Sequence, residues 1–223
     1  MQIKNGDLVN IFSELVMYAM HTGTYERSRE YEFTVKYLMP LLVLPKPYRK
    51  TIRILDVGGA DSRLSKWLSE EGFDVYVIDI REDDYGSAKF IKANVLEYDF
   101  PEEFFDIIVA VSTVEHIGLN CYGQRTEAPD GDIKTMKELK KWLKVGGLLI
   151  LTVPYGKPHH PPTFERVYNP SNMWRLQLDD LDIIERRFYC YNPRDPNNFL
   201  ECSEEEALHT DAVMCVSARK IAK

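Results

Sequence analysis

The chain has 223 residues, 44% of them hydrophobic, and a formal net charge of −7 at pH 7, which predicts one α/β domain with a sizeable core. The acidic balance argues against a broad nucleic-acid interface, which would need a basic face, and leaves room only for a small basic patch. There is no run of 18 apolar residues and no signal-peptide pattern, so we expect no membrane span and a cytoplasmic location.

An N-terminal helical extension is expected over residues 1–50. Apolar residues follow the i, i+3, i+4 spacing of a helix from 7 to 19, and a second helix is expected over 25–39. Pro40 should end or kink this second helix. The mixed aromatic and charged cluster at 25–31 fits either a solvated helix face or a lid that reaches a bound ligand.

The rest of the chain is organised around residues 51–72. A short apolar run at 52–57 predicts a buried parallel strand, and Gly58 and Gly59 follow it directly. Helical spacing then begins, and Gly72 falls where a helix would be capped. Such a strand, glycine turn and helix N-terminus form a site for a nucleotide-like ligand, because backbone and free N–H groups can approach it closely.

The composition of the turn narrows the choice of ligand. The dinucleotide fingerprint G-x-G-x-x-G is absent, because Ala60, Asp61 and Ser62 follow the glycines, and there is no P-loop Lys-Ser/Thr pair. Asp56, directly before the turn, suits a ligand that carries an amine and a positive charge rather than a pyrophosphate.

A second strand is expected at 74–79, and it ends in Asp79. This acid lies about twenty residues after the glycine turn, where a carboxylate can accept hydrogen bonds from both ribose hydroxyls. The segment 81–88 is short for a crossover helix, so we expect only a turn before a strand at 89–91. A fourth, central strand is expected at 104–111. Asp132 should cap a helix over 133–143, and a fifth strand is expected at 148–153.

With these motifs in this order, the sequence resembles the class I S-adenosylmethionine-dependent methyltransferases, whose first motif reads acidic-x-Gly-x-Gly. The run DVGGADS departs from that form, because its second glycine is shifted or replaced. The resemblance extends from about residue 51 to 154. It rests on the glycine turn, Asp79, Asn94, the Phe105-Asp106 start of the fourth strand, the run 112–116, and Gly146-Gly147 before a fifth strand.

The resemblance implies a Rossmann-like, mostly parallel sheet of seven strands with helices on both faces. The first five strands should be parallel and the last one antiparallel, with the cofactor across the ends of the first and fourth. S-adenosylmethionine is the implied cofactor, and Asn94 should meet its adenine, although most relatives carry an acid there. The implied cofactor-binding residues are Asp56, Gly58, Gly59, Ala60, Asp79, Ile80, Asn94, Val95 and Ser112.

We expect one methyltransferase domain over 1–223, with the cofactor-binding core at 51–154 and an acceptor-side loop and the last strands at 155–223. Within the latter part, a short helix is expected at 171–178 and strands at 182–191 and 212–220, joined by a long connection at 192–210. The runs EHIGLNCYGQ and VPYGKP resemble a poorly characterised bacterial and archaeal branch. The four cysteines are scattered without a C-x-x-C pair, so reduced, structural thiols are expected rather than a metal site.

Methyl transfer from a sulfonium releases a neutral thioether, so positioning and desolvation suffice unless the acceptor must lose a proton. Glu115 and His116 stand at the end of the fourth strand, where catalytic groups are expected. His116 could be that base, or could only pack and hydrogen-bond beside the cofactor. His159 and His160 could join it in a metal cluster, but no carboxylate spacing supports this, and no metal is expected. The expected substrate-binding residues are Tyr122, Tyr155, Arg166 and Tyr168.

Several functions remain open at this stage. The favoured one is methylation of a hydroxyl or amine of a small polar molecule, such as a sugar or glycan precursor. A protein methyltransferase and a catalytically silent cofactor-binding partner subunit are the alternatives. A nicotinamide oxidoreductase of the same layered fold is disfavoured by the missing G-x-G-x-x-G fingerprint. The sequence does not indicate an oligomeric state.

Overall fold

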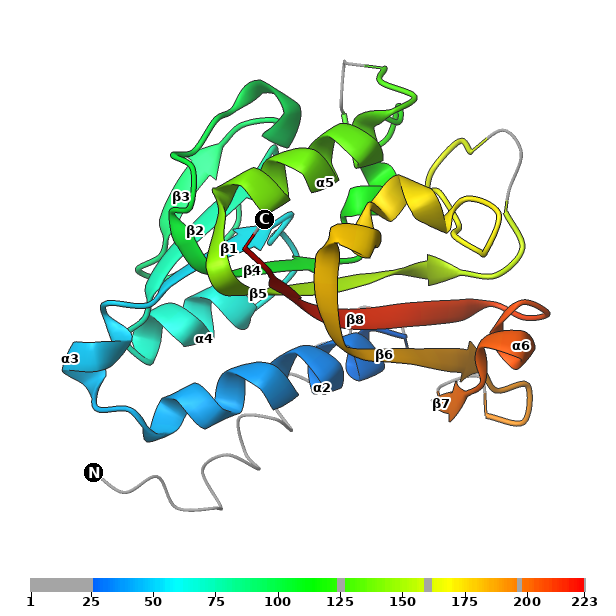
Figure 1. Cartoon of the computed structure of the whole chain (residues 1–223), viewed down its shortest axis with the longest axis horizontal. Coiled ribbons are helices and arrows are strands. Elements are labelled where there is room, and N and C mark those ends of the chain that lie inside the picture. Colours follow the sequence, from blue (N-terminus) through cyan, green and yellow to red (C-terminus); the bar gives the residue numbers. More distant parts are fainter. Residues whose placement is uncertain (1–25, 124–126, 159–161, 196–197, 223) are drawn as a thin grey trace.

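The computed structural model describes residues 26–123, 127–158, 162–195 and 198–222. One sheet lies at the centre, with helices on both of its faces (Figure 1). Helix α5 (Gly131–Trp142) covers one face, whereas α2 (Glu26–Leu38) and α4 (Leu64–Glu70) cover the other. The expected helix at 7–19 lies outside the described residues, and so do Tyr25, His159 and His160.

Within the described residues the sheet has eight strands in the order β3-β2-β1-β4-β5-β8-β6-β7. The first five strands are parallel, as predicted, and β8 is antiparallel to both of its neighbours. The predicted count of seven is wrong, because the expected connection at 192–210 contains a further strand, β7, and a short helix. The strands are β1 (Arg53–Val57), β2 (Asp74–Asp79), β3 (Lys89–Lys92), β4 (Phe105–Val111), β5 (Leu143–Tyr155), β6 (Leu181–Tyr191), β7 (Phe199–Cys202) and β8 (Ala212–Lys220).

Some of the helical predictions are confirmed and one is wrong. Helix α2 ends just before Pro40, as expected, and residues 80–88 contain no helix. The helix expected at 171–178 is instead a pair of 3₁₀ turns. The short helical elements are η1 (Met39–Val43), α3 (Lys46–Arg49), η2 (Val95–Glu97), η3 (Val114–His116), η4 (Met173–Leu176), η5 (Leu178–Asp180) and α6 (Glu204–Ala207).

Two local expectations around α5 and β5 were wrong. Asp132 does not cap α5, since the helix begins at Gly131 and the buried Asp132 carboxylate accepts hydrogen bonds from Arg175, at 2.6 Å, and from Tyr168. Strand β5 begins at Leu143 rather than at 148, because the Gly146-Gly147 pair lies in a bulge inside the strand. In both cases a tertiary contact overrides the local signal.

The two faces of the sheet bury separate apolar clusters. One cluster lies under α5 and includes Trp142, and the other lies under α2 and α4 and includes Phe33 and Leu68. Strand β4 contributes Ile108 to the first cluster and Val109 to the second, as expected for a strand that alternates between two buried faces. The central parallel strands are therefore fixed from both sides, which holds their carboxyl ends at one edge.

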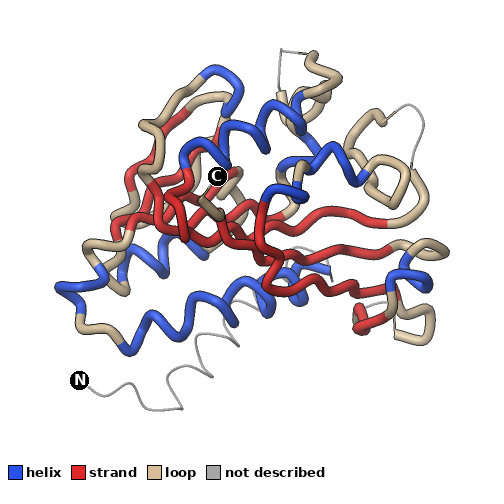
Figure 2. The backbone as a smooth tube through the Cα atoms, in the orientation of Figure 1, coloured by secondary structure: helices blue, strands red, loops and turns tan. Residues whose placement is uncertain are grey.

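Strands β6 and β7 lie at one end of the sheet (Figure 2), and a disulfide joins them. Its cysteines, Cys190 and Cys202, are 12 residues apart in the sequence. The expectation of reduced thiols is therefore wrong for this pair, since no sequence spacing announced that β7 would place the two side chains together. Cys121 and Cys215 are buried and lie outside this disulfide.

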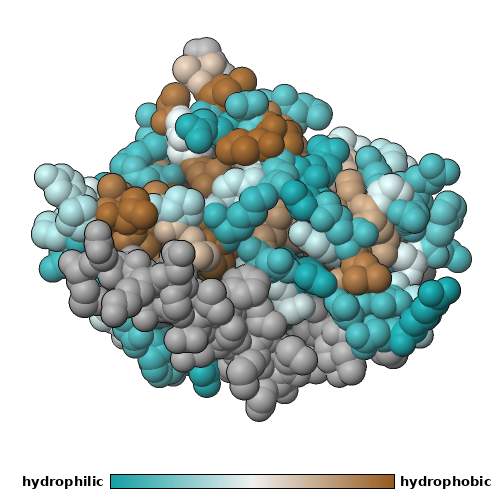
Figure 3. All heavy atoms as spheres, turned by 90° about the horizontal axis from the view of Figure 1, so that it is seen from below, coloured by the Kyte–Doolittle hydropathy of each residue, from teal (hydrophilic) through white to brown (hydrophobic). Residues whose placement is uncertain are grey.

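The surface offers no sign of a spanning segment in the described part of the chain. None of the described helices combines the length and the apolar character needed to cross a membrane. Seen from below, the coloured surface is mostly hydrophilic, with separate hydrophobic patches (Figure 3).

Candidate active site

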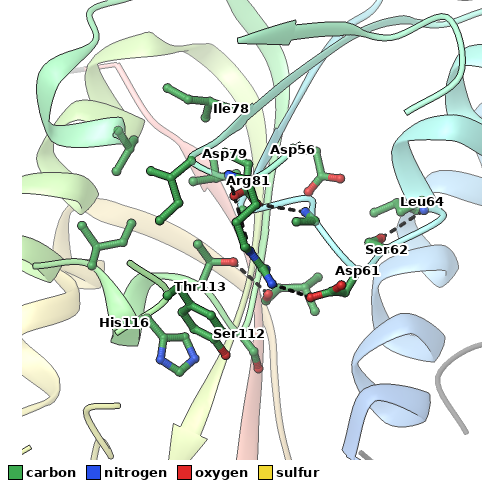
Figure 4. A pocket seen from close by; sticks show the side chains of 18 of the residues that line it. Asp56, Asp61, Ser62, Leu64, Ile78, Asp79, Arg81, Ser112, Thr113 and His116 are labelled. Atoms are coloured by element: carbon green, nitrogen blue, oxygen red, sulfur yellow. Dashed lines mark hydrogen bonds and ion pairs between the residues drawn. The ribbon is translucent and has the colours of Figure 1, made fainter. Parts of the chain in front are cut away.

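A cavity of about 520 Å³ opens at the carboxyl ends of β1, β2 and β4 (Figure 4). This is the edge of a doubly wound sheet where ligands bind. The glycine turn, the end of β2, the segment 93–95 and the segment 111–117 all line it, and α2 contributes residues from the amino-terminal side.

The glycine turn leaves no room for side chains. Gly58 has a φ of +72°, and a Cβ atom there would lie 2.3 Å from the Thr113 side chain. At Gly59 a Cβ atom would lie 2.8 Å from the Asp56 carboxylate. Gly58 and Ala60 line the cavity, whereas Gly59 lies behind them and serves the packing of the turn. The backbone of the turn can therefore approach a ligand closely.

Asp79 is buried at the end of β2 and lines the cavity. Its two oxygens accept hydrogen bonds from the backbone N–H groups of Ala60, at 2.9 Å, and Arg81, at 2.8 Å. A carboxylate has about four acceptor positions, so about two are left for hydroxyl donors. Those remaining positions suit the two ribose hydroxyls of a nucleoside.

Asp56 lies below the glycine turn and faces the same cavity. Burial raises the pKa of its carboxyl group to about 6, against a hydrogen bond from Ser65 that favours the ionised form. Because Asp79 is also acidic and nearby, this end of the cavity favours a ligand that carries positive charge.

Asn94, Val95 and Ile80 also line the cavity, and the contact of Asn94 and Val95 with adenine stays a prediction. The Asn94 side-chain oxygen caps η2 by accepting a hydrogen bond from the Leu96 N–H at 3.0 Å. An amide oxygen has a second lone pair. A contact of Asn94 with adenine would therefore use that second position.

Helix α2 supplies two residues that the sequence analysis did not assign to the site. Arg27 and Tyr31 line the cavity, so part of the 25–31 cluster faces the pocket and not solvent. Glu30, between them, is fully buried and bonded to Ser112 and Thr152. The mixture of aromatic and charged residues was the available signal, and it was interpreted first as a solvated helix face and only second as a lid.

Arg81 crosses the mouth of the cavity (Figure 4). Its guanidinium pairs with Asp61 at 2.6 Å and lies over the ring of Tyr122, 4.7 Å from the centroid. Tyr122 lines the cavity, as predicted for an acceptor-side residue. Arg81 itself was missed, because a single arginine after a strand carries no motif.

His116 lines the cavity beside Ser112 and Thr113 (Figure 4). Its Nδ1 lies 2.8 Å from the carbonyl oxygen of Phe164. Since a carbonyl only accepts, Nδ1 carries the proton and Nε2 keeps the lone pair of a neutral imidazole. Burial, with a smaller effect from nearby arginines, lowers the pKa of His116 to about 4. The ring is therefore neutral at physiological pH and can act as a base, although a weaker one than an ordinary histidine.

Glu115 does not line the cavity but lies fully buried next to His116. Its Oε1 is 3.7 Å from Nε2 of His116, and neither carboxyl oxygen has a hydrogen-bond partner among the described residues. Burial raises the pKa of this carboxyl well above its usual value. Glu115 is therefore placed to act through His116, and its predicted direct catalytic role lacks a contact with the cavity.

Three predicted acceptor residues do not line the cavity, and the structure gives each an internal partner. Tyr155 donates a hydrogen bond to Glu204 at 2.5 Å, and Tyr168 donates one to Asp132. Arg166 is buried and donates to main-chain carbonyls at 115, 117 and 128, which ties two loops together. The sequence placed all three near the correct strand end but could not show which way they point. Among the described residues, no three metal-ligating side chains are close enough to hold an ion.

The strand order, the glycine turn and the position of the cavity define a Rossmann-like class I methyltransferase fold. A solved structure with this fold is the 1,6-didemethyltoxoflavin-N1-methyltransferase of Burkholderia thailandensis, which contains 1,6-didemethyltoxoflavin and S-adenosylhomocysteine. It has a TM-score of 0.53 and 16% identity, and the match covers 93% of this chain and 88% of that one.

Curated relatives agree with the fold. A putative methyltransferase of Encephalitozoon cuniculi is 26% identical, over 76% of this chain and 78% of its own length. A ubiquinone biosynthesis O-methyltransferase of Rickettsia felis is 23% identical, over 64% of this chain and 65% of its own. A family model described as "Caenorhabditis protein of unknown function, DUF268" matches residues 82–185. The fold and the curated relatives together support an S-adenosylmethionine-dependent methyltransferase.

Proposed function

We propose that this methyltransferase acts on a hydroxyl or amine of a small polar molecule, such as a sugar or glycan precursor. The observation that carries the proposal is the position of His116. A neutral imidazole with its proton on Nδ1 lines the same cavity as the Asp79 carboxylate. A hydroxyl or amine acceptor must lose a proton when it is methylated, and His116 offers the base.

The charge of the cavity supports S-adenosylmethionine as its ligand, because two carboxyl groups, those of Asp56 and Asp79, line it. Asp79 would hold the ribose, Asn94 and Val95 the adenine, and the turn at Gly58 and Ala60 would pass along the amino-acid part. Ile80, Asp56 and Ser112 complete the wall on this side. When bound, the cofactor supplies a methyl group on a positively charged sulfur, which leaves as a neutral thioether.

The acceptor side is formed by His116, Tyr122 and Arg81. Nε2 of His116 would take the proton that a hydroxyl or amine acceptor loses when it is methylated. The adjacent carboxyl of Glu115 lies 3.7 Å from Nε2, but burial favours its neutral form, so it adds little charge to offset the imidazolium that forms. The ring of Tyr122 lies 5.1 Å from that of His116 between centroids and forms part of the wall beside the base.

The relatives support a small acceptor through their printed names. One is an O-methyltransferase of ubiquinone biosynthesis, and another is an N-methyltransferase crystallised with its small heterocyclic substrate. Methylation of a protein is the second candidate, and a catalytically silent partner subunit the third. Methylation of a protein is less favoured because it needs no base enclosed in a cavity. A silent partner subunit is less favoured because it needs no base at all.

Mass spectrometry of a metabolite extract incubated with the protein and methyl-labelled S-adenosylmethionine tests the proposal. We expect one small compound to gain a labelled methyl group, and His116→Ala to abolish this gain. Label that appears only in proteins would favour the second candidate. Cofactor binding without any labelled product in extracts of the source organism would favour the third.

Four expectations from the sequence stay predictions. They are the location in the cytoplasm, the lack of a nucleic-acid partner, the division of the chain at residues 50 and 154, and the bacterial or archaeal branch. The similarity to a protein of Encephalitozoon cuniculi does not single out that branch.

A further inference from the structure

Glu30 is a buried carboxylate that contacts three separate parts of the site. It lies on α2 and is fully buried. The hydroxyls of Ser112 and Thr152 both donate to its Oε1, the latter at 2.6 Å. The guanidinium of Arg27 donates to its Oε2 at 3.2 Å.

These contacts connect α2 to the working edge of the sheet. Ser112 follows the end of β4, and Thr152 lies near the end of β5, so Oε1 joins the helix to two adjacent strand ends. Ser112 has a φ of +40°, an uncommon conformation for a residue other than glycine. Its hydroxyl bond to Glu30 and the hydrogen bonds from its N–H to Thr152 hold it there.

Oε2 has a different task. It holds Arg27 at the wall of the cavity, and the same guanidinium also donates to the carbonyl of Val111 at 3.3 Å. The other arginine in the cavity wall, Arg81, pairs with Asp61 at the mouth. The anionic group of S-adenosylmethionine is its α-carboxylate, and a guanidinium fixed in place is the preferred partner for a carboxylate.

We propose that Glu30 is a positioning residue for the methyl donor. Through Oε1 it docks α2 on the strand ends, and through Oε2 it holds Arg27 where the cofactor carboxylate binds. The N-terminal helix is therefore part of the donor site and not merely a cover. This inference rests on S-adenosylmethionine occupying the cavity.

The two oxygens allow the two tasks to be separated. Glu30→Gln keeps one oxygen for Ser112 and Thr152 but replaces the oxygen that faces Arg27 with an amide N–H₂ group. We expect calorimetry to show affinity for S-adenosylmethionine weakened about tenfold, since a charged hydrogen bond that orients the ligand's partner is lost. The KM for the cofactor should rise by a similar factor, with kcat changed little, because the base and acceptor side are untouched.

A matched control lies two residues further along the helix. Glu32 forms the same i, i+3 pair with Arg29, at 2.7 Å, but its side chain is 45% exposed and does not line the cavity. Glu32→Gln removes an Arg–Glu pair of equal spacing from the same helix. We expect its cofactor affinity to equal that of the wild-type chain.

A double-mutant cycle distinguishes positioning from a general structural role. If Glu30 acts through Arg27, Glu30→Gln should have no further effect on cofactor affinity once Arg27→Ala is present. Independent, additive effects would overturn the inference. An unchanged cofactor affinity in Glu30→Gln would also overturn the inference. The melting temperature of this variant would be measured at the same time to show that it is folded.

If Glu30→Gln does not fold, Thr152→Val takes its place. This change keeps the side-chain shape and removes one donor to Glu30, so cofactor affinity should fall several-fold in the wild-type background and not in Arg27→Ala. Equal losses in both backgrounds would overturn the inference. If the wild-type chain does not bind S-adenosylmethionine, the cofactor site itself is contradicted. If the wild-type and Glu30→Gln chains both bind it normally, only the inference about Glu30 is contradicted.

Discussion

The parallel and antiparallel halves of the sheet contribute to the site in different ways. The parallel strands β1, β2 and β4 end at the cavity and carry Asp56, Asp79 and the residues that lead to His116. The antiparallel strands β6, β7 and β8 contribute no residue to its lining. They contact α2 instead, where Arg29 donates to the Phe199 carbonyl at 2.7 Å.

Ligand binding and folding stability should therefore depend on different halves of the sheet. Side chains at the ends of parallel strands should govern ligand binding and turnover with modest effects on folding. Side chains in the antiparallel half should govern the free energy of unfolding and reach the ligand only through α2. Substitutions at the cavity, compared with substitutions away from it, test this division.

The largest effect is expected at His116. If this residue is the base, His116→Ala should lower kcat by about 10²–10⁴-fold while cofactor affinity stays nearly intact. The control is His209→Ala, an exposed histidine just after α6 in the antiparallel half, which should leave kcat unchanged. Steady-state kinetics and calorimetry measure the two quantities. If affinity and turnover fall together, His116 supports the cofactor and is not the base.

The next effect concerns the disulfide of the antiparallel half. Cys190→Ala opens a closed loop of about a dozen residues, which should lower the free energy of unfolding by about 2–4 kcal/mol, as urea denaturation would measure. Affinity for S-adenosylmethionine should change far less. Dithiothreitol should destabilise the wild-type chain in the same way and leave Cys190→Ala unaffected. A large loss of affinity with little loss of stability would contradict the division between the halves.

Strand β2 carries an aspartate at each end, and the two make a matched pair. Asp79→Ala should weaken cofactor affinity by about tenfold or more, because two hydroxyl donors lose a charged acceptor. Asp74, at the far end of the strand, pairs with Lys89 at 2.6 Å and is absent from the cavity lining. Asp74→Ala should bind the cofactor normally. Equal dissociation constants for the two folded variants would remove Asp79 from the site.

The smallest expected effect is the change of turnover with pH. Neutral His116 is the active form, so protonation lowers the rate, and burial lowers the pKa of His116 to about 4 from an ordinary 6.5. At saturating cofactor, kcat should therefore stay nearly flat from pH 7.5 to 5.5 and fall only as the pH approaches 4. An ordinary histidine would already lose about tenfold at pH 5.5. Such an early loss, absent from His116→Ala, would show that the site is more open to water than the structure indicates.

The sequence predicted the parallel half well, because its signals are local. The run ending at Val57, the glycines after it and the acid at Asp79 each fix a strand end by chemistry that occurs within a few residues. The predicted cofactor-side residues other than Gly59 line the cavity for this reason. That placement leaves their contacts with the cofactor a prediction.

The antiparallel half and the acceptor side depended on contacts between distant residues. Strand β7 forms by pairing with β6, and its four residues carry no strand signal of their own. Tyr155, Arg166 and Tyr168 were assigned to the acceptor because of where they follow β5. Their orientation is set by Glu204, Asp132 and main-chain carbonyls far along the chain, which periodicity cannot reveal. Arg27 and Tyr31 were uncertain for the same reason.

A crystal structure with S-adenosylhomocysteine is the most direct test of the proposed cofactor site. We predict that the ribose hydroxyls lie within hydrogen-bond distance of the Asp79 carboxylate, that the adenine lies beside Asn94 and Val95, and that the sulfur faces His116. Density for the ligand outside this cavity, or a bound ligand whose ribose leaves Asp79 in contact only with the N–H groups of Ala60 and Arg81, would contradict the account.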